Sequence, residues 1–227
     1  QPIHIRTQEV EDEGQVVNRI EQHVFRAHAM DKIEMLARIL QAEGRGSTIV
    51  FCRTKRTAQN AADELKERGY RSVSLHGDMG QAAREKALAD FKKGKADILV
   101  ATDVAARGID IDGITHVINY QAPEDDKTYV HRIGRTARAG AHGIAVTFVD
   151  WDELPRWKMI DETLGLNLGE PVETYSSSEH LYQALKIPAG SKGRIEKPKS
   201  EKPKIESAPK VERVKRERKR TKRINSK

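Results

Sequence analysis

Three arginines and two glycines fall within ten residues of the chain, HRIGRTARAG, from His131 to Gly140. Arg135 and Arg138 are three residues apart, a spacing that puts two side chains on one face of a helix. Guanidinium groups this close repel each other unless an anion lies between them, and adjacent glycines let a ligand approach the backbone. The pattern indicates either a clamp for a phosphate or carboxylate, or arginines neutralised within the chain by Asp110, Asp112 or Glu124. The residues alone favour neither.

A second segment that can do chemistry, ATDVAARGIDIDG, begins at Ala101 and follows an apolar run. Thr102 and Asp103 stand at the end of that run, and Gly108 gives the loop freedom to turn. Asp110 can accept hydrogen bonds from hydroxyl groups such as those of a ribose. The same composition is also typical of a short capped turn without a ligand, and this alternative stays open.

A third segment, HGDMGQAAREKAL, places a tight turn from Gly77 to Gly80 directly before a helical pattern. The free amide groups and the positive dipole end of such a helix suit an anion. Gln81 and Arg84, one helical step apart, extend the same face. The competing interpretation is an arginine at a helix start that is merely solvated.

The elements that must position these segments alternate between strand-like and helix-like patterns. Five short apolar runs rich in β-branched residues predict strands buried on both faces, at residues 47–52, 71–75, 96–102, 115–120 and 143–149. Helical patterns lie between them at 29–44, 54–69 and 81–94, with a last one near 151–164 that tolerates Pro155 close to its start. This order predicts an α/β fold with a mostly parallel open sheet, whose ligands lie at the carboxyl ends of the strands.

Two of the helical patterns carry clear end signals. In the first, Gly44 ends a stripe formed by Ile33, Leu36, Ala37 and Leu40. The second opens with Thr54 as a candidate cap, closes at Gly69, and turns inward Ala58, Ala61, Ala62 and Leu65. Three segments that can do chemistry, FCRTK, HGDMG and ATDVAARGID, fall at the carboxyl ends of predicted strands. We therefore expect these three chemical segments to lie at one edge of the sheet.

Positive charge is concentrated at the C-terminal end of the chain. Residues 188–227 hold 16 Lys and Arg against 5 Asp and Glu, whereas the whole chain has a formal net charge of +7. This stretch has too few apolar residues to form a core and holds no Phe, Trp or Tyr, so we expect disorder and phosphate attraction without base stacking. The alternative is a solvated tail without a partner.

Other site classes find little support in the residues. Cys52 is the single cysteine, which excludes a disulfide within the chain and fits a reducing compartment. The histidines His76, His116, His131 and His142 are scattered, so no metal site is predicted. There is no apolar run of membrane-spanning length and no signal peptide at the N-terminus, and we expect a cytoplasmic protein without membrane contact.

Taken together, the segments IVFCRTK, HGDMGQAAR, ATDVAARGID and HRIGRTARAG resemble motifs IV, IVa, V and VI of the DEAD-box ATP-dependent RNA helicases, bacterial type. The resemblance covers residues 16–164 in the family's order and spacing. The histidine that opens the last motif, His131, is specific, because related superfamily members usually have Gln there; a DNA-translocating helicase is disfavoured for this reason.

The resemblance implies a RecA-like second lobe, a three-layer open sandwich, and roles for individual residues. Arg138 would be the arginine finger, with Arg135 beside it on the γ-phosphate of ATP. Gly108 and Asp110 would belong to the nucleotide site, with Asp110 on the ribose, and Arg107 and His131 would couple the two lobes. The RNA backbone would be held, with little base information, by Thr54, Gly77, Gln81, Arg84 and Thr102.

The sequence departs from the complete family pattern in one respect. It contains neither a phosphate loop nor an Asp-Glu-Ala-Asp run; AADEL at Ala61–Leu65 lies within a helical pattern. We therefore expect ATP and Mg²⁺ to be held mainly by an N-terminal lobe that this chain lacks, and the chain alone to be inactive. The competing class is an RNA-binding module whose tail tethers ribosomal or messenger ribonucleoprotein.

The expected organisation has four parts. Residues 1–15 would be an interlobe linker remnant and 16–170 the helicase C-terminal domain. A post-domain segment would follow at 171–187, and a disordered Lys/Arg-rich tail would occupy 188–227. The abrupt start without Met indicates a fragment of a longer chain.

Overall fold

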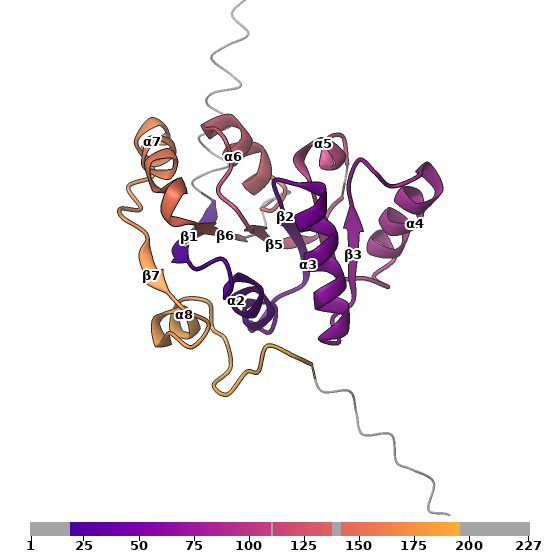
Figure 1. Ribbon diagram of the computed structural model, residues 1–227, viewed down its shortest axis with the longest axis horizontal. Helices are drawn as coiled ribbons and strands as arrows, with labels where there is room; N and C mark the ends of the chain where they lie inside the picture. The colour runs from indigo at the N-terminus through magenta and orange to yellow at the C-terminus, as the bar shows by residue number, and fades with distance from the viewer. Residues whose placement is uncertain (1–18, 110, 138–141, 196–227) are drawn as a thin grey trace, which may run out of the picture. The chain divides into compact units, whose positions relative to one another are not determined.

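The computed structural model describes residues 19–109, 111–137 and 142–195, and these form an α/β fold around one parallel sheet (Figure 1). The strand order is β3-β4-β2-β5-β6-β1-β7, and every pair of neighbours is parallel. The strands are β1 (Ile20–Ala27), β2 (Ser47–Phe51), β3 (Ser72–Leu75), β4 (Ile98–Ala101), β5 (Ile114–Asn119), β6 (Gly143–Val149) and β7 (Val172–Thr174). The predicted RecA-like fold class is confirmed.

Helices cover both faces of the sheet, which gives three layers. One face carries α2 (Lys32–Ile39), α3 (Lys55–Glu67) and α8 (Glu179–Ala184), whose apolar side chains share one core cluster. The other face carries α4 (Gln81–Lys92), α5 (Asp103–Ala106), α6 (Asp126–Ile133) and α7 (Leu154–Leu164), with a 3₁₀ turn at Trp151–Glu153. Figure 1 shows α6 and α7 on the opposite side of β1 and β6 from α2 and α8.

Strand β2 shows why the sheet needs both helical layers. Ile49 and Phe51 pack into the core beneath α4 and α5, whereas Val50 between them belongs to the core beneath α2 and α3. Successive side chains of a strand point to opposite faces, so a run that is apolar at every position must be covered twice. Each such side chain contributes about 1.5–3 kcal/mol of burial free energy.

Helix α3 follows its sequence signals closely. The Thr54 hydroxyl accepts a hydrogen bond from the Thr57 amide at 3.1 Å, a cap of the kind that contributes about 1 kcal/mol. The predicted inward positions Ala58, Ala61, Ala62 and Leu65 are all buried. The chain leaves the helix through Gly69, whose φ of 92° is the left-handed conformation that favours glycine.

The domain extends further than the sequence analysis expected. Residues 171–187 were expected to follow the domain, yet β7 pairs with β1 and Leu181 of α8 lies fully buried in the core. A strand of three residues with one buried side chain gives no period to read. Strand β1 was also not predicted, because polar side chains interrupt its apolar positions.

Residues 186–195, which we call the strap, pack against the ends of α2 and α3. The Glu43 amide donates to the Lys186 carbonyl at 3.0 Å, and the Ile195 amide donates to the Arg68 carbonyl at 2.9 Å. The tail was expected to begin at residue 188, but this residue lies within the strap, so the expected boundary is too early. Residues 196–227 lie outside the described part of the chain. No helix within the described ranges has the length and apolar character needed to cross a membrane.

Candidate functional site

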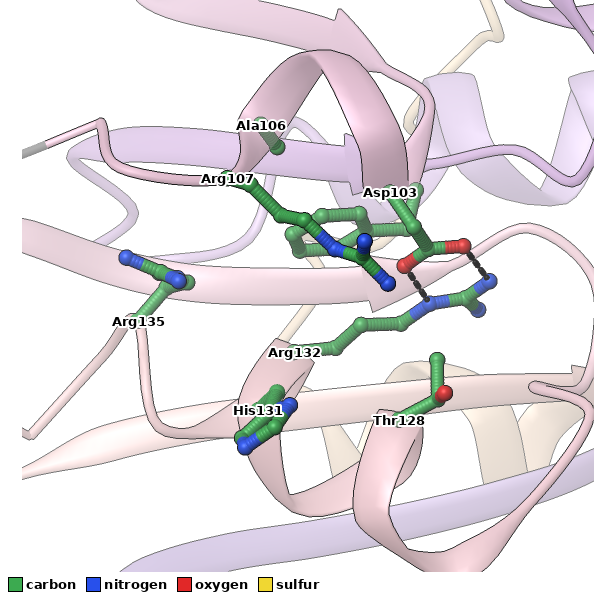
Figure 2. A pocket seen from close by; sticks show the side chains of 8 residues that line it. Asp103, Ala106, Arg107, Thr128, His131, Arg132 and Arg135 are labelled. Atoms are coloured by element: carbon green, nitrogen blue, oxygen red, sulfur yellow. Dashed lines mark hydrogen bonds and ion pairs between the residues drawn. The ribbon is translucent and has the colours of Figure 1, made fainter.

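A small pocket lies at the carboxyl ends of β2, β4 and β5, the edge where the three chemical segments were expected to meet. Its volume is about 60 Å³. Figure 2 shows α5 on one side and α6 on the other, with the Arg107 side chain extending across the pocket between them. The lining residues are Phe51, Asp103, Ala106, Arg107, Thr128, His131, Arg132 and Arg135.

Helix α6 is fixed at both ends, and this determines which motif residues face the pocket. The Asp125 carboxylate caps the helix by accepting from the Thr128 amide at 2.6 Å, a bond that lowers the pKa of Asp125. The helix ends at Ile133, and Thr136 turns inward with its hydroxyl donating to the Ile114 carbonyl at 2.6 Å. Arg132 consequently lies in the last helical turn, and Arg135 lies beyond the helix.

This end point corrects one expectation from the sequence. Arg135 and Arg138 were expected to share a helix face, but α6 stops two residues before Arg135, so Arg135 does not lie on this helix. The reason is Gly134 at the C-cap, followed by the buried Thr136. Arg138 and Asp110 both lie outside the described residues.

Arg132 is the arginine that is neutralised within the chain. It is 2% exposed, and its Nε and Nη2 donate to Oδ1 and Oδ2 of Asp103, each at 2.7 Å (Figure 2). The partner is thus Asp103, not any of the acidic residues considered from the sequence. Two parallel charge-assisted bonds of this kind fix orientation as well as charge. Asp103 gave a usable signal, because it stands at the end of a predicted strand on the same sheet edge.

The remaining donors of Arg132 reach the next loop. Nη1 donates to Asn119 Oδ1 at 3.2 Å and to the Gln121 carbonyl at 3.1 Å, and the guanidinium carbon lies 5.4 Å from the Phe51 ring centroid. A buried cation is tolerated only when its protons find acceptors. Here the acceptors are the first residue of α5, the last residue of β5 and a residue of the loop after β5, so Arg132 joins α5, α6 and β5.

Three nitrogen-bearing side chains of the pocket lie closer to solvent than Arg132. Arg107 and His131 are exposed, and Arg135 is partly buried with its Nη1 donating to the Ile109 carbonyl at 3.1 Å. Gly108, with φ of 72°, provides the turn that brings Ile109 to Arg135. Arg107, His131 and Arg135, which the sequence analysis singled out from separate segments, therefore line one pocket.

The residues expected to hold RNA lie along the same edge, on the side of β2, β3 and β4. Thr54 and Gly77 are exposed, and Lys55 Nζ to Asp78 Oδ2 at 2.7 Å joins their two loops. The Thr102 amide donates to the Leu75 carbonyl at 3.2 Å, which holds the third loop against β3, but Thr102 itself is only 9% exposed.

The remaining two residues of that set belong to α4. Gln81 begins the helix and is exposed, with Nε2 donating to Glu85 Oε1 at 2.7 Å. Arg84, one turn later, is half-buried. The loops that carry Thr54 and Gly77 are therefore in direct contact. Gln81 begins the helix that follows the Gly77 loop.

Metal binding and thiol chemistry find no geometry in this region. Within the described ranges, no three His, Cys, Asp or Glu side chains converge as metal ligands, and Asp103, the pocket's carboxylate, is already engaged by Arg132. Burial raises the pKa of the Cys52 thiol to about 12, so that thiol is unreactive packing. The donors of the pocket suit phosphate oxygens, not a divalent cation.

Comparisons with known proteins agree with this arrangement. A family model described as the helicase conserved C-terminal domain matches residues 31–140. The ATP-dependent RNA helicase CshA of Listeria monocytogenes is 49% identical over 168 residues, which make up 74% of this chain and 32% of that protein. This chain thus spans about a third of the length of that relative.

Solved structures share the fold. The E. coli DEAD-box protein SrmB, bound to regulator of ribonuclease activity A, is 33% identical with a TM-score of 0.62, over 71% of this chain and 92% of that one. S. cerevisiae Dbp5 bound to RNA and ADP BeF3 is 31% identical with a TM-score of 0.62, over 74% and 44%. With the four motifs gathered at one edge of a RecA-like sheet, the chain belongs to the DEAD-box RNA helicase family, as a C-terminal lobe of the bacterial type.

Proposed function

We propose that this lobe works with an ATP-binding lobe in an RNA-stimulated ATPase that unwinds or remodels short RNA duplexes. The observation that carries the proposal is the pocket between α5 and α6. Arg107, His131 and Arg135 line it, yet its volume of about 60 Å³ is far below the roughly 300–1,000 Å³ of a complete small-molecule site. Such a pocket fits one wall of a phosphate site whose other wall is a second lobe.

The chemistry of phosphoryl transfer suits this division. Catalysis there consists mainly of positioning and of neutralising charge on the transferring group, which a guanidinium from a second lobe can supply. We assign this role to Arg135 together with Arg138, the arginine finger. Asp110 would hold the ribose beside Gly108. Binding and hydrolysis of ATP would supply the free energy for opening the duplex. The described residues offer no set of ligands for Mg²⁺, so we assign Mg²⁺ binding to the other lobe.

RNA would bind across both lobes, and here it would meet the exposed edge at Thr54, Gly77 and Gln81, with Arg84 and Thr102 behind them. Hydroxyl, amide and guanidinium groups suit phosphate and 2′-OH contacts that carry little base information. The RNA and ADP BeF3 bound to the similar Dbp5 structure support this partner. In the proposed cycle, RNA and ATP close the lobes, Arg107 and His131 couple them, and closure bends one strand of a short duplex.

The basic tail extends the proposal. Its Lys and Arg residues would contact RNA phosphates, including those of ribosomal or messenger ribonucleoprotein, without base stacking. The chain without its partner lobe is expected to show no ATP hydrolysis.

Substitution of Arg135 tests the proposal in a protein that carries this lobe together with the ATP-binding lobe, which we call the two-lobed protein. Arg135→Ala should lower RNA-stimulated ATP hydrolysis by about a thousandfold, the range of arginine fingers. Its RNA affinity without nucleotide should stay within about twofold. Arg71→Ala is the matched control, because Arg71 is an exposed arginine that pairs with Asp97 at the opposite edge.

Two results would contradict the proposal. If the rate of RNA-stimulated ATP hydrolysis by Arg135→Ala stayed within about threefold of that of the unchanged protein, Arg135 would have no role in the reaction. A two-lobed protein that binds RNA but shows no RNA-stimulated hydrolysis at all would instead indicate the RNA-binding module.

A further inference from the structure

The buried Arg132 lies where the nucleotide side and the RNA side of the lobe meet. Its side chain belongs to α6, the helix that also carries His131 and precedes Arg135. Its carboxylate partner Asp103 directly follows Thr102 and begins α5. One bidentate pair therefore joins the loop expected to hold RNA to the helix expected to face the nucleotide.

The connection continues to the other RNA-facing loop. Arg132 Nη1 donates to the Gln121 carbonyl at 3.1 Å, and the Gln121 side chain accepts from the Arg53 amide at 3.0 Å. Arg53 is the residue before Thr54, and its guanidinium is held by the buried Glu153. Arg132 is thus bonded directly to Asp103, Asn119 and Gln121, and the loop after β2 is joined to it through Gln121.

The geometry of this junction resists independent movement. Planar guanidinium and carboxylate groups bound through two 2.7 Å contacts lose both bonds if α5 rotates relative to α6. Burial strengthens the penalty, because water cannot replace a missing partner at a side chain that is 2% exposed. Displacement of Thr102 by RNA must therefore move α6 as well, and the reverse holds for a displacement of α6.

We propose that Arg132 and Asp103 are positioning residues that couple RNA binding to nucleotide binding in this lobe. The inference rests on the proposed function and assigns neither residue a contact with RNA or ATP. Coupling between two ligands is reciprocal, so it can be measured as the factor by which one ligand changes the affinity for the other.

The measurement uses the two-lobed protein and a labelled single-stranded RNA, titrated with and without ADP BeF3. The ratio of the two RNA affinities is the coupling factor. Asp103→Asn keeps the side-chain shape but removes the charge and one acceptor, and Arg132→Lys keeps the charge but removes the fork. Each should reduce the coupling factor by at least about fivefold, while RNA affinity without nucleotide changes less than about twofold.

A matched control separates positioning from stability. Arg68→Lys makes the same substitution at an arginine bound by Glu34 and Glu64 at the far end of α3, away from both sites. It should lower the melting temperature and leave the coupling factor unchanged. Melting curves of all variants confirm folding at the assay temperature, and the isosteric Asp103→Asn keeps the test valid if Arg132→Lys does not fold.

The outcomes distinguish this inference from the function on which it rests. A coupling factor that persists in folded Asp103→Asn or Arg132→Lys protein overturns the inference alone, since the pair would then be only structural. A factor near one in the unchanged protein overturns the proposed function and this inference with it.

Discussion

The two edges of the sheet use similar arginine–carboxylate clusters for different ends. At the carboxyl edge, Arg132 is bound by Asp103 and by two acceptors near β5. At the amino edge, Arg68 is bound by Glu34, Glu64 and the Gly193 carbonyl of the strap. The Arg132 side chain is 2% exposed and that of Asp103 is 31% exposed, whereas the Arg68 side chain is 18% exposed.

The difference lies in what surrounds each cluster. Around Arg132, the side chains of Arg107 and His131 are exposed and can meet a ligand. At the edge where Arg68 lies, other charged side chains form ion pairs within the domain, such as those of Arg45 and Arg71 with Asp97. The amino edge thus anchors the strap before the tail, and the carboxyl edge holds the groups that we propose as ligand contacts.

The largest effect expected from this comparison is on stability. Arg132→Ala leaves Asn119, which is fully buried, and Asp103, whose side chain is 31% exposed, without their partner, and it should lower the free energy of unfolding by about 3 kcal/mol. Arg68→Ala should cost only about 1–2 kcal/mol, because both of its carboxylate partners, 28% and 45% exposed, can be solvated. Urea unfolding of the chain measures both, and equal decreases would remove the distinction between the edges.

The next effect concerns pH and the amino edge. Burial lowers the pKa of His116 to about 4, with a further contribution from Arg45, whereas an unfolded histidine titrates near about 6.5. The unfolded state therefore binds a proton that the folded state refuses between these values. Stability should be unaffected above pH about 6.5, fall as pH drops through the window, and level off below about 4.

The size of the acid effect follows from the shift. It amounts to up to about 3 kcal/mol, at 1.36 kcal/mol for each unit of pKa. His116→Gln should flatten the dependence of unfolding free energy on pH across this window. An unchanged slope in that variant would assign the acid sensitivity to other groups.

The smallest effect concerns RNA and the tail that follows the strap. Replacing Lys215, Arg216, Arg218, Lys219 and Arg220 by Gln should flatten the salt dependence of single-stranded RNA affinity by up to about 3.5 in log–log slope, roughly 0.7 for each phosphate that is no longer neutralised. The affinity itself should fall by about tenfold at moderate salt. Unfolding free energy should not change.

Three exposed lysines of the folded domain serve as the control for the tail, with the change in slope compared per charge removed. Lys92, Lys93 and Lys95 are exposed at the C-terminal end of α4, away from the carboxyl edge. Their replacement by Gln should leave the salt slope nearly unchanged. Similar slopes for both sets would mean that the tail attracts RNA only through net charge.

Much of the fold could be predicted because local patterns were strong. The five predicted strands occur within one or two residues of their expected ends, and α3 has the cap, buried face and glycine stop that its residues indicate. Strand β7 and helix α8 could not be read, since three and six residues give too short a period. The domain boundary at residue 170 was wrong for that reason.

The candidate site divides in the same way. The motif residues Arg107, His131 and Arg135 could be assigned from their segments, and the structure places all three on one pocket. The partner of Arg132 was missed, although Asp103 stands at the end of a predicted strand, because it is 29 positions away and several acidic residues are nearer in sequence. Roles on ATP and RNA remain predictions, and those of Arg138 and Asp110 concern residues outside the described part of the chain.

The sequence by itself determined the elements, their order and the family motifs, because hydrophobic period, caps and glycine stops act over a few neighbouring residues. Only the tertiary structure decided which arginine became structural and which stayed near solvent. That choice depended on where α6 ended and on how closely β4 and β5 brought Asp103 and Asn119 to its last turn. A guanidinium is buried only where such acceptors converge, and their convergence is a property of the folded sheet.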